Sequence, residues 1–211
     1  MILVGQYDSP FVRRIAVALH WYGVKFERNT MSVFGDAERM REINPLGRIP
    51  SLILDGGETL IDSWAIQDWL DESAPVERRL TPPAGAERRN VLRLTALAAG
   101  AVDKAGAMVY EKTIRPPEKR YAPWLERCQV QLATALDALE TACGDAWLAG
   151  PRLSQADVML GAMTWYVSAR APEAKIAARC PRIMRHYNRV LMLPEFQMTA
   201  PADDEAMPAQ L

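Results

Sequence analysis

The sequence has few cysteines and histidines, and neither type is spaced for cross-linking or metal binding. Its three cysteines, Cys128, Cys143 and Cys180, are an odd number, lie far apart and form no CxxC pair. We therefore expect no disulfide framework, and a reducing compartment fits. His20 and His186 have no companions at metal-ligand spacing, so we predict no metal site.

An excess of one charge and a long apolar run are also missing. The formal net charge is −1, and arginine pairs such as Arg13-Arg14 are short. We interpret these pairs as solvated helix faces and expect no nucleic-acid partner. The longest uncharged run, 158–169, is too short to span a bilayer and is typical of a buried helix. The first residues, MILVGQYDSP, carry no basic leader and no apolar stretch of signal-peptide length, so we expect a cytoplasmic protein.

Apolar residues make up 49% of the 211-residue chain, enough for a sizeable core. The first part of the chain alternates between strand-like and helix-like segments. We predict strands at 2–4, 24–29, 50–54 and 58–61. We predict helices at 9–23, 36–43 and 63–73, the last one capped by Ser63. The resulting order, βαβαββα, is mixed α/β.

A proline- and glycine-rich stretch then interrupts the pattern, and every later segment has helical periodicity. We predict a mixed α/β domain at 1–78, a linker at 79–86, an all-helical domain at 87–200 and a mobile tail at 201–211. The helix that starts near Glu87 is rich in small residues, which permits close helix contact. Ser154-x-x-Asp157 is a capping box that begins a core helix, and we give it no catalytic role.

Four short motifs stand out: SPFVRR at 9–14, NPLGRIP at 44–50, LIDSWAI at 60–66 and GPRLSQAD at 150–157. In this order and at these distances they resemble the glutathione transferases over nearly the whole chain. The first looks like the serine motif of the plant tau class and of many bacterial members. The resemblance implies a thioredoxin-like first domain, an all-helical second domain and glutathione as co-substrate. It is stronger support for the family than for any one activity.

Ser9 is the candidate catalytic residue, because it lies where a strand ends and a helix begins. A glutathione thiol, like that of cysteine, has a free pKa of roughly 8.5. A hydrogen bond to the thiolate contributes roughly 1.5–3 kcal/mol, and the helix terminus about 0.3–1 kcal/mol. Together they could lower the thiol pKa by around two units, at about 1.4 kcal/mol per unit. The alternative is that Ser9 is only an N-cap. The resemblance adds Phe11 to the glutathione-binding residues.

The remaining glutathione-binding residues follow from the resemblance. It implies a cis Ile49-Pro50 bond, with the backbone of Ile49 paired to the cysteinyl part of the peptide. Arg48 is expected near the glycine carboxylate, although a solvated arginine is the alternative. Asp62 is expected at the α-ammonium of the γ-glutamyl end and Ser63 at its α-carboxylate. An N-cap with an adjacent acid would explain the last pair equally.

Some positions depart from the family's patterns. Members that use a catalytic tyrosine carry it where this chain has Gln6. Tyr7 is one position off and should point elsewhere. Phe34, Met108 and Tyr110 are candidates for the wall of a co-substrate cleft between the domains, and core packing is their alternative role.

We predict a transferase that joins glutathione to a small hydrophobic electrophile, as in detoxification, and that forms a homodimer. The dimer rests on the resemblance and on the small-residue helix near Glu87. Glutathione-dependent isomerisation, dehalogenation or peroxide reduction would use the same first domain. A non-catalytic interaction module is a further alternative, and failure to bind glutathione would favour it.

Overall fold

The computed structural model describes residues 1–205, and the chain divides into two compact units. The first comprises Met1–Pro83 together with residues 193–205 of the described chain, and the second comprises Ala84–Met192. The division between Pro83 and Ala84 falls inside the linker predicted at 79–86. Residues 193–205 belong to the first unit, whereas the sequence placed 193–200 with the helical domain. Of the predicted tail, residues 206–211 lie outside the described residues.

The first unit is built on a four-stranded sheet with the strand order β2-β1-β3-β4. Its strands are β1 (Ile2–Val4), β2 (Glu27–Asn29), β3 (Ser51–Ile53) and β4 (Thr59–Ile61). β1 runs parallel to β2 and antiparallel to β3, and β3 and β4 form an antiparallel hairpin. All four strands lie within the segments predicted from the sequence.

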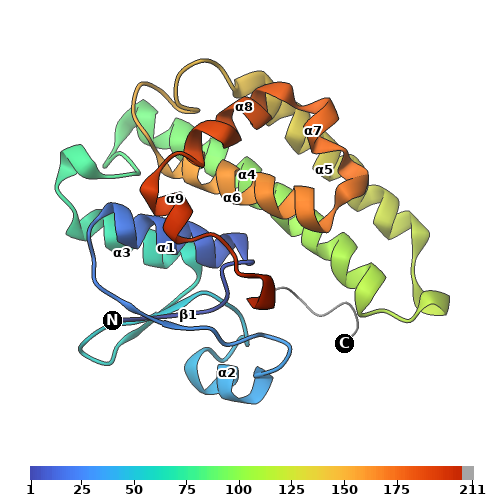
Figure 1. Cartoon of the computed structure of the whole chain (residues 1–211), viewed down its shortest axis with the longest axis horizontal. Helices are drawn as coiled ribbons and strands as arrows, with labels where there is room; N and C mark the ends of the chain where they lie inside the picture. The colour runs from blue at the N-terminus through green and yellow to red at the C-terminus, as the bar shows by residue number, and fades with distance from the viewer. Residues whose placement is uncertain (206–211) are drawn as a thin grey trace. The chain divides into compact units, whose positions relative to one another are not determined.

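Helices cover both faces of this sheet. They are α1 (Pro10–Trp21), α2 (Ala37–Ile43) and α3 (Ser63–Ser73), followed late in the chain by α9 (Pro194–Met198). α1 and α3 lie against one face and α2 against the other (Figure 1). The short turns η1 (Val76–Arg78) and η4 (Asp203–Glu205) complete the unit. The predicted βαβαββα order and thioredoxin-like fold are confirmed.

The second unit is helical throughout its described residues. It contains α4 (Gly85–Thr113), α5 (Ala122–Ala142), α6 (Gln155–Arg170), α7 (Ile176–Arg179) and α8 (Pro181–Val190), with the turns η2 (Pro117–Lys119) and η3 (Pro172–Ala174). α4 packs against α5 and α6. No strand occurs in the described part of this unit, where an isolated bridge joins Trp147 and Gly150. The predicted capping box of Ser154 and Asp157 is present at the start of α6.

The small residues of α4 serve packing within this unit. Ala98, Ala101 and Ala105 are fully buried, which lets α4 approach its neighbouring helices closely. The predicted close helix contact is therefore made inside one chain. Other small residues of the helix stay accessible, since Ala96 is exposed and Gly100 and Ala107 are half-buried, so the dimer prediction is neither supported nor contradicted.

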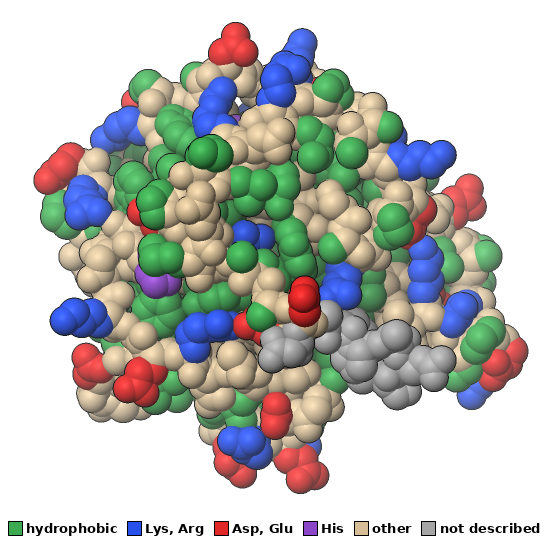
Figure 2. Space-filling model, viewed as in Figure 1, with side chains coloured by type: hydrophobic (Ala, Val, Ile, Leu, Met, Phe, Trp, Pro, Cys, Tyr) green, Lys and Arg blue, Asp and Glu red, His purple; other side chains and the backbone are tan. Residues whose placement is uncertain are grey.

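The surface carries charges of both signs. On the face shown in Figure 2, basic and acidic side chains are interspersed among apolar and polar ones. No helix among the described residues is both long and apolar enough to cross a membrane. Within the same residues, no group of three or more histidine, cysteine or acidic side chains is placed to hold a metal ion.

Candidate functional site

Three loops meet at one end of the four-stranded sheet. Val4 at the end of β1 pairs with Ser51 at the start of β3, and Ser51 pairs with Ile61 at the end of β4. This register brings together the segments that follow β1, precede β3 and follow β4. A Cβ added to Gly5 would lie 2.9 Å from the Cβ of Ile49, so the first two segments touch, and only glycine fits there. These segments carry the serine, the cis-proline loop and the acid-serine pair predicted from the sequence.

Ser9 begins α1 and is half-buried. Its Oγ accepts a hydrogen bond from the Val12 N–H at 3.5 Å, and its own N–H donates to the Gln6 carbonyl at 3.2 Å. A distance of 3.5 Å makes a weak cap. No described group accepts the proton of the Ser9 hydroxyl, so this proton is available for a ligand. Ser9 is thus an N-cap whose donor capacity is unused.

Asn44 shapes the loop that precedes β3. Its buried side chain donates from Nδ2 to the Arg48 carbonyl at 2.8 Å and accepts at Oδ1 from the Leu46 N–H at 3.0 Å. The Ile49-Pro50 bond that follows is cis, as the resemblance implied. Among the described residues, no backbone group pairs with the N–H or C=O of Ile49, and no acid pairs with the exposed guanidinium of Arg48. This loop therefore presents a free backbone edge beside a cation.

The turn into α3 brings Asp62 and Ser63 to the same end of the sheet. Asp62 has a φ of 71°, and its Oδ1 accepts from the Trp64 N–H at 2.9 Å. The N-cap is thus Asp62, one residue earlier than predicted, because aspartate caps as well as serine and its carboxylate reaches the N2 amide. Ser63 is the first helical residue and is buried.

Two arginines of α1 are buried, which overturns our interpretation of Arg13-Arg14 as a solvated face. Arg13 is 2% exposed and Arg14 is 0% exposed. Arg13 donates to the carbonyl of Phe196 in α9 at 3.3 Å, and its guanidinium lies over the Phe196 ring. Arg14 reaches Ser63: its Nη1 lies 3.5 Å from Oγ, and its guanidinium carbon lies 4.7 Å from the centroid of the Trp64 ring.

The helical spacing contained a signal for this burial. Arg14 lies three residues after Phe11 and four residues before Ala18, so it shares the apolar face that packs on the sheet and on α3. The residue type misled us, since arginine is rarely fully buried without a partner.

Tyr7 joins the C-terminal part of the first unit, a contact that the sequence did not suggest. Its backbone N–H donates to Glu205 Oε2, and Glu205 Oε1 lies 2.5 Å from Arg28 Nη2. The Arg28 guanidinium stacks 3.4 Å from the centroid of the Tyr7 ring. Burial raises the pKa of the Tyr7 phenol, although the charge of Arg28 opposes this. Glu205 therefore ties the loop that carries Ser9 to residues nearly two hundred positions away.

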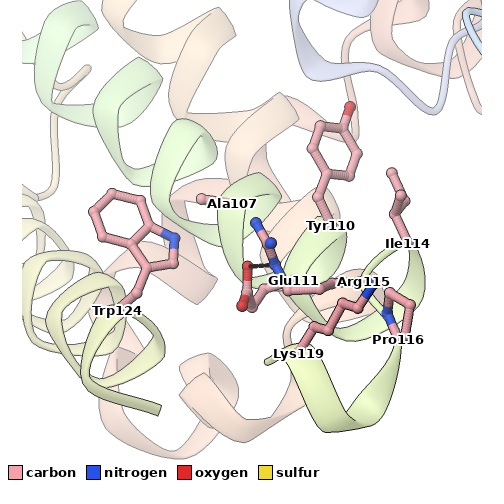
Figure 3. A pocket seen from close by; sticks show the side chains of 8 residues that line it. All are labelled: Ala107, Tyr110, Glu111, Ile114, Arg115, Pro116, Lys119 and Trp124. Carbon is pink, nitrogen blue, oxygen red and sulfur yellow. Dashed lines mark hydrogen bonds and ion pairs between the residues drawn. The ribbon is translucent and has the colours of Figure 1, made fainter. Parts of the chain in front are cut away.

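A separate pocket lies within the second unit, where α4 ends. Its volume is about 480 Å³, and its lining residues are Ala107, Tyr110, Glu111, Ile114, Arg115, Pro116, Lys119 and Trp124. Figure 3 shows the Glu111–Arg115 ion pair in the middle, with the Trp124 ring to one side and Tyr110 and Ile114 to the other. Glu111 accepts from the Tyr121 N–H and from Arg115, both at 2.8 Å. These bonds, the first one foremost, lower the pKa of the Glu111 carboxyl.

The other predicted site residues are distributed as follows. Tyr110 lines this pocket, whereas Met108 is 1% exposed, packs into the interior of the unit and does not line it. Phe34 is half-buried in the first unit, and its N–H donates to Ser32 Oγ at 3.2 Å. Phe11 is half-buried in the first turn of α1.

Comparisons with known proteins identify the family to which this fold belongs. The family models described as Glutathione S-transferase, N-terminal domain and Glutathione S-transferase, C-terminal domain match residues 3–82 and 122–189. A maleylacetoacetate isomerase of Pseudomonas aeruginosa is 29% identical over 99% of this chain and 100% of its own length.

Two solved structures are similar over nearly the whole chain. A glutathione S-transferase of Methylobacterium radiotolerans in complex with glutathione sulfonate has a TM-score of 0.89 and 30% identity, covering 95% of this chain and 94% of that one. One from Methylobacillus flagellatus with glutathione bound has a TM-score of 0.89 and 28% identity, covering 95% and 99%. With both domain models matched and the fold shared from end to end, the chain belongs to the glutathione S-transferase family.

Proposed function

We propose that the chain binds glutathione at the edge of the sheet and holds its thiol as a thiolate for attack on a small electrophile. The observation that carries the proposal is a set of unused hydrogen-bonding groups on adjacent loops of the first unit. They are the Ser9 hydroxyl, the backbone of Ile49 and the beginning of α3 at Asp62 and Ser63. Similar proteins with glutathione or glutathione sulfonate bound support this choice of ligand.

Each group suits one part of the tripeptide. The free hydroxyl proton of Ser9 suits the thiolate, and the free N–H and C=O of Ile49 suit the cysteinyl backbone. Asp62 uses Oδ1 to cap α3, so its Oδ2 remains for the α-ammonium. The unpaired N–H groups at the start of α3 suit the α-carboxylate. Arg48 has an exposed, unpaired guanidinium for the glycine carboxylate.

The thiolate is the species that reacts, so the proposed function depends on the pKa of the bound thiol. A hydrogen bond from the Ser9 hydroxyl favours the charged form by roughly 1.5–3 kcal/mol. That corresponds to a pKa lower by about one to two units. From roughly 8.5 in free solution, the pKa of the thiol would fall to about 6.5–7.5, so a substantial fraction of the thiol would be ionised at neutral pH.

The pocket of the second unit indicates the kind of small molecule that this unit binds. Tyr110, Ile114 and Trp124 supply apolar surface, and all three side chains are substantially exposed. Arg115 and Lys119 supply positive charge, and the Arg115 charge is shared with Glu111. We propose that this pocket binds a small molecule with an aromatic or aliphatic body and an acidic group.

Isomerisation is the second candidate, because a relative of nearly equal length is named maleylacetoacetate isomerase. In such a reaction the thiolate would add to a conjugated double bond, the bond would rotate and the thiolate would leave. Glutathione would then be regenerated, whereas a transferase consumes one glutathione for each product.

The test has two steps. Isothermal titration with glutathione should show binding, and absence of binding would sink both enzymatic functions in favour of a non-catalytic module. Turnover is then followed with an activated aryl chloride and with maleylacetoacetate, while free thiol and product are measured together. Loss of one thiol per product supports the transferase, and product without loss of thiol supports the isomerase.

A further inference from the structure

Glu205 is a buried acid of the first unit that lies far along the chain from the loop it contacts. It belongs to the turn η4, drawn in dark red beside the loop between β1 and α1 (Figure 1), and it is 6% exposed. An acid is rarely buried to this extent unless it is paired, because its charge loses the solvation of water. One carboxylate oxygen pairs with Arg28, and the other accepts from the Tyr7 N–H.

The peptide group between Gln6 and Tyr7 is hydrogen-bonded on both of its sides. Its N–H, which belongs to Tyr7, donates to Glu205 Oε2. Its carbonyl, which belongs to Gln6, accepts from the Ser9 N–H at 3.2 Å. Because a peptide group is planar, the two bonds together fix its orientation, and a rotation that breaks one also breaks the other. Glu205 is therefore linked to the backbone of Ser9 through a single rigid group.

Strand β2 holds the same loop from its other side. The Asn29 carbonyl accepts from the Gly5 N–H at 2.8 Å. The Arg28 guanidinium lies 3.4 Å from the centroid of the Tyr7 ring, and Tyr7 is only 2% exposed. Since this guanidinium also pairs with Glu205, the acid completes an arrangement that fixes both the ring and the backbone of Tyr7.

We propose that Glu205 is a positioning residue for Ser9. By fixing the peptide group between Gln6 and Tyr7, it holds the start of α1 so that the Ser9 hydroxyl points toward the thiolate of bound glutathione. A hydrogen bond weakens steeply when its donor is misaligned, so a small rotation of this loop removes much of the stabilisation of the thiolate. This inference rests on the proposed function, since the thiolate is part of glutathione.

The experiment measures the pKa of the bound thiol in the parent protein and in Glu205→Ala. The ultraviolet absorbance of the thiolate is titrated against pH with glutathione bound. The pKa should rise by about half a unit or more, which lowers the ratio of thiolate to thiol at a given pH by about threefold or more. The loss of a negative charge would by itself lower the pKa, so a rise separates positioning from electrostatics.

The affinity for glutathione should change much less. Ile49, Asp62 and Ser63, which the proposed function assigns to other parts of the tripeptide, lie on other loops of the unit. Isothermal titration should therefore give a dissociation constant within about threefold of that of the parent. If a folded Glu205→Ala fails to bind glutathione, Glu205 supports the whole site, and its assignment to Ser9 is wrong.

A double-mutant cycle with Ser9→Ala tests whether Glu205 acts through Ser9. In the Ser9→Ala background, Glu205→Ala should leave the pKa of the thiol unchanged, because the hydroxyl that it positions is already gone. An equal rise in both backgrounds overturns the inference. Asp203→Ala is the matched control, since it removes an exposed acid of the same turn. It should not raise the pKa, and a rise equal to that in Glu205→Ala also counts against the inference.

Failure of the proposed function can be told apart from failure of the inference. If the parent does not bind glutathione, or if Ser9→Ala leaves the pKa of the thiol unchanged, the proposed role of Ser9 fails and the inference with it. If Ser9→Ala raises the pKa and Glu205→Ala does not, the inference alone fails. Should Glu205→Ala not fold, Glu205→Gln decides. Its neutral acceptor is about half as strong, so the pKa should still rise by about 0.3 units or more; an unchanged pKa overturns the inference.

Discussion

Side chains at the edge of the sheet have both a structural role, as helix caps, and a role in the proposed chemistry. Ser9 begins α1 and Asp62 begins α3, and each leaves hydrogen-bonding capacity unused. Replacing an N-cap by alanine costs about 0.5–2 kcal/mol of stability. The hydrogen bond that caps α1 at Ser9 is long, so we expect the loss of stability in Ser9→Ala to lie at the lower end of this range. The variant should therefore stay folded, and its catalytic effect can be measured.

Ser9→Ala should raise the pKa of the bound thiol by about one unit or more, because a charge-assisted hydrogen bond is lost. Turnover at neutral pH should fall about tenfold or more and recover partly as the pH rises, since the thiol then ionises without help. The ultraviolet absorbance of the bound thiolate, titrated against pH, measures this shift in the pKa of the thiol. An unchanged thiolate titration in Ser9→Ala would show that Ser9 is only a cap.

Asp62→Ala should instead raise the KM for glutathione more than it lowers kcat.

The sequence predicted the positions of some of these residues correctly and missed others, for physical reasons. The resemblance implied the cis bond before Pro50, and a local capping motif predicted the start of α1 at Ser9; both are confirmed. The cap of α3 was placed one residue late, since Asp62 and Ser63 cap equally well and periodicity does not choose between neighbours. Arg14 was missed because a buried cation contradicts the usual preference of its residue type.

At the scale of the elements, α1 connects parts of the chain that the sequence keeps far apart. It packs against α3 and α9, and the loop before it is tied to Glu205 in η4. Local patterns predict where helices begin and end, and most of these boundaries are confirmed. They carry no sign that an acid at the far end of the chain pairs with Arg28 of β2, because that contact depends on the tertiary fold.

Glu205→Ala should loosen the loop that carries Ser9. The substitution removes the acceptor of the Tyr7 N–H and the partner of Arg28, and bonds to a charged group contribute roughly 1.5–3 kcal/mol each. Local opening of the C-terminal segment limits the loss, so we expect the free energy of unfolding to fall by about 1–2 kcal/mol. The Tyr7 amide should exchange its hydrogen faster, as NMR would measure. Asp203→Ala, in the same turn, is the control, and equal exchange rates in the two variants would contradict this role.

For the molecule as a whole, the change of periodicity in the sequence placed a linker at 79–86, and the two compact units divide between Pro83 and Ala84. It could not show that residues 193–205 return to the first unit. Nor could it show the pocket at the end of α4, which depends on how side chains of α4, η2 and α5 are turned. The homodimer stays a prediction, because some small residues of α4 pack inside their own unit while Ala96, Gly100 and Ala107 stay at least partly exposed.

The stability of the molecule should depend on pH through His186 in α8. Burial, with a smaller effect of Arg189, lowers the pKa of His186 to about 4. Its Nε2 lies 3.3 Å from Asp157 Oδ1, but this carboxylate already accepts from the Leu148 N–H and from the N–H and hydroxyl of Ser154. An unfolded histidine has a pKa of about 6.5. Between about pH 6.5 and 4 the unfolded chain therefore takes up a proton that the folded chain does not, and stability is lost as the pH falls.

His186→Gln should remove this dependence. Denaturant unfolding between pH 7 and 4 should show the parent losing up to about 3 kcal/mol more than the variant, since each pKa unit is worth about 1.4 kcal/mol. Burial raises the pKa of Asp157, which acts in the opposite direction, because the folded carboxyl then takes up a proton first as the pH falls. Asp157 is present in both proteins, so most of its contribution cancels in the difference between the two curves. His20→Gln is the control, because it replaces a less buried histidine of the other unit and should keep most of the slope. Parallel curves for the parent and His186→Gln would show that His186 is not the group responsible.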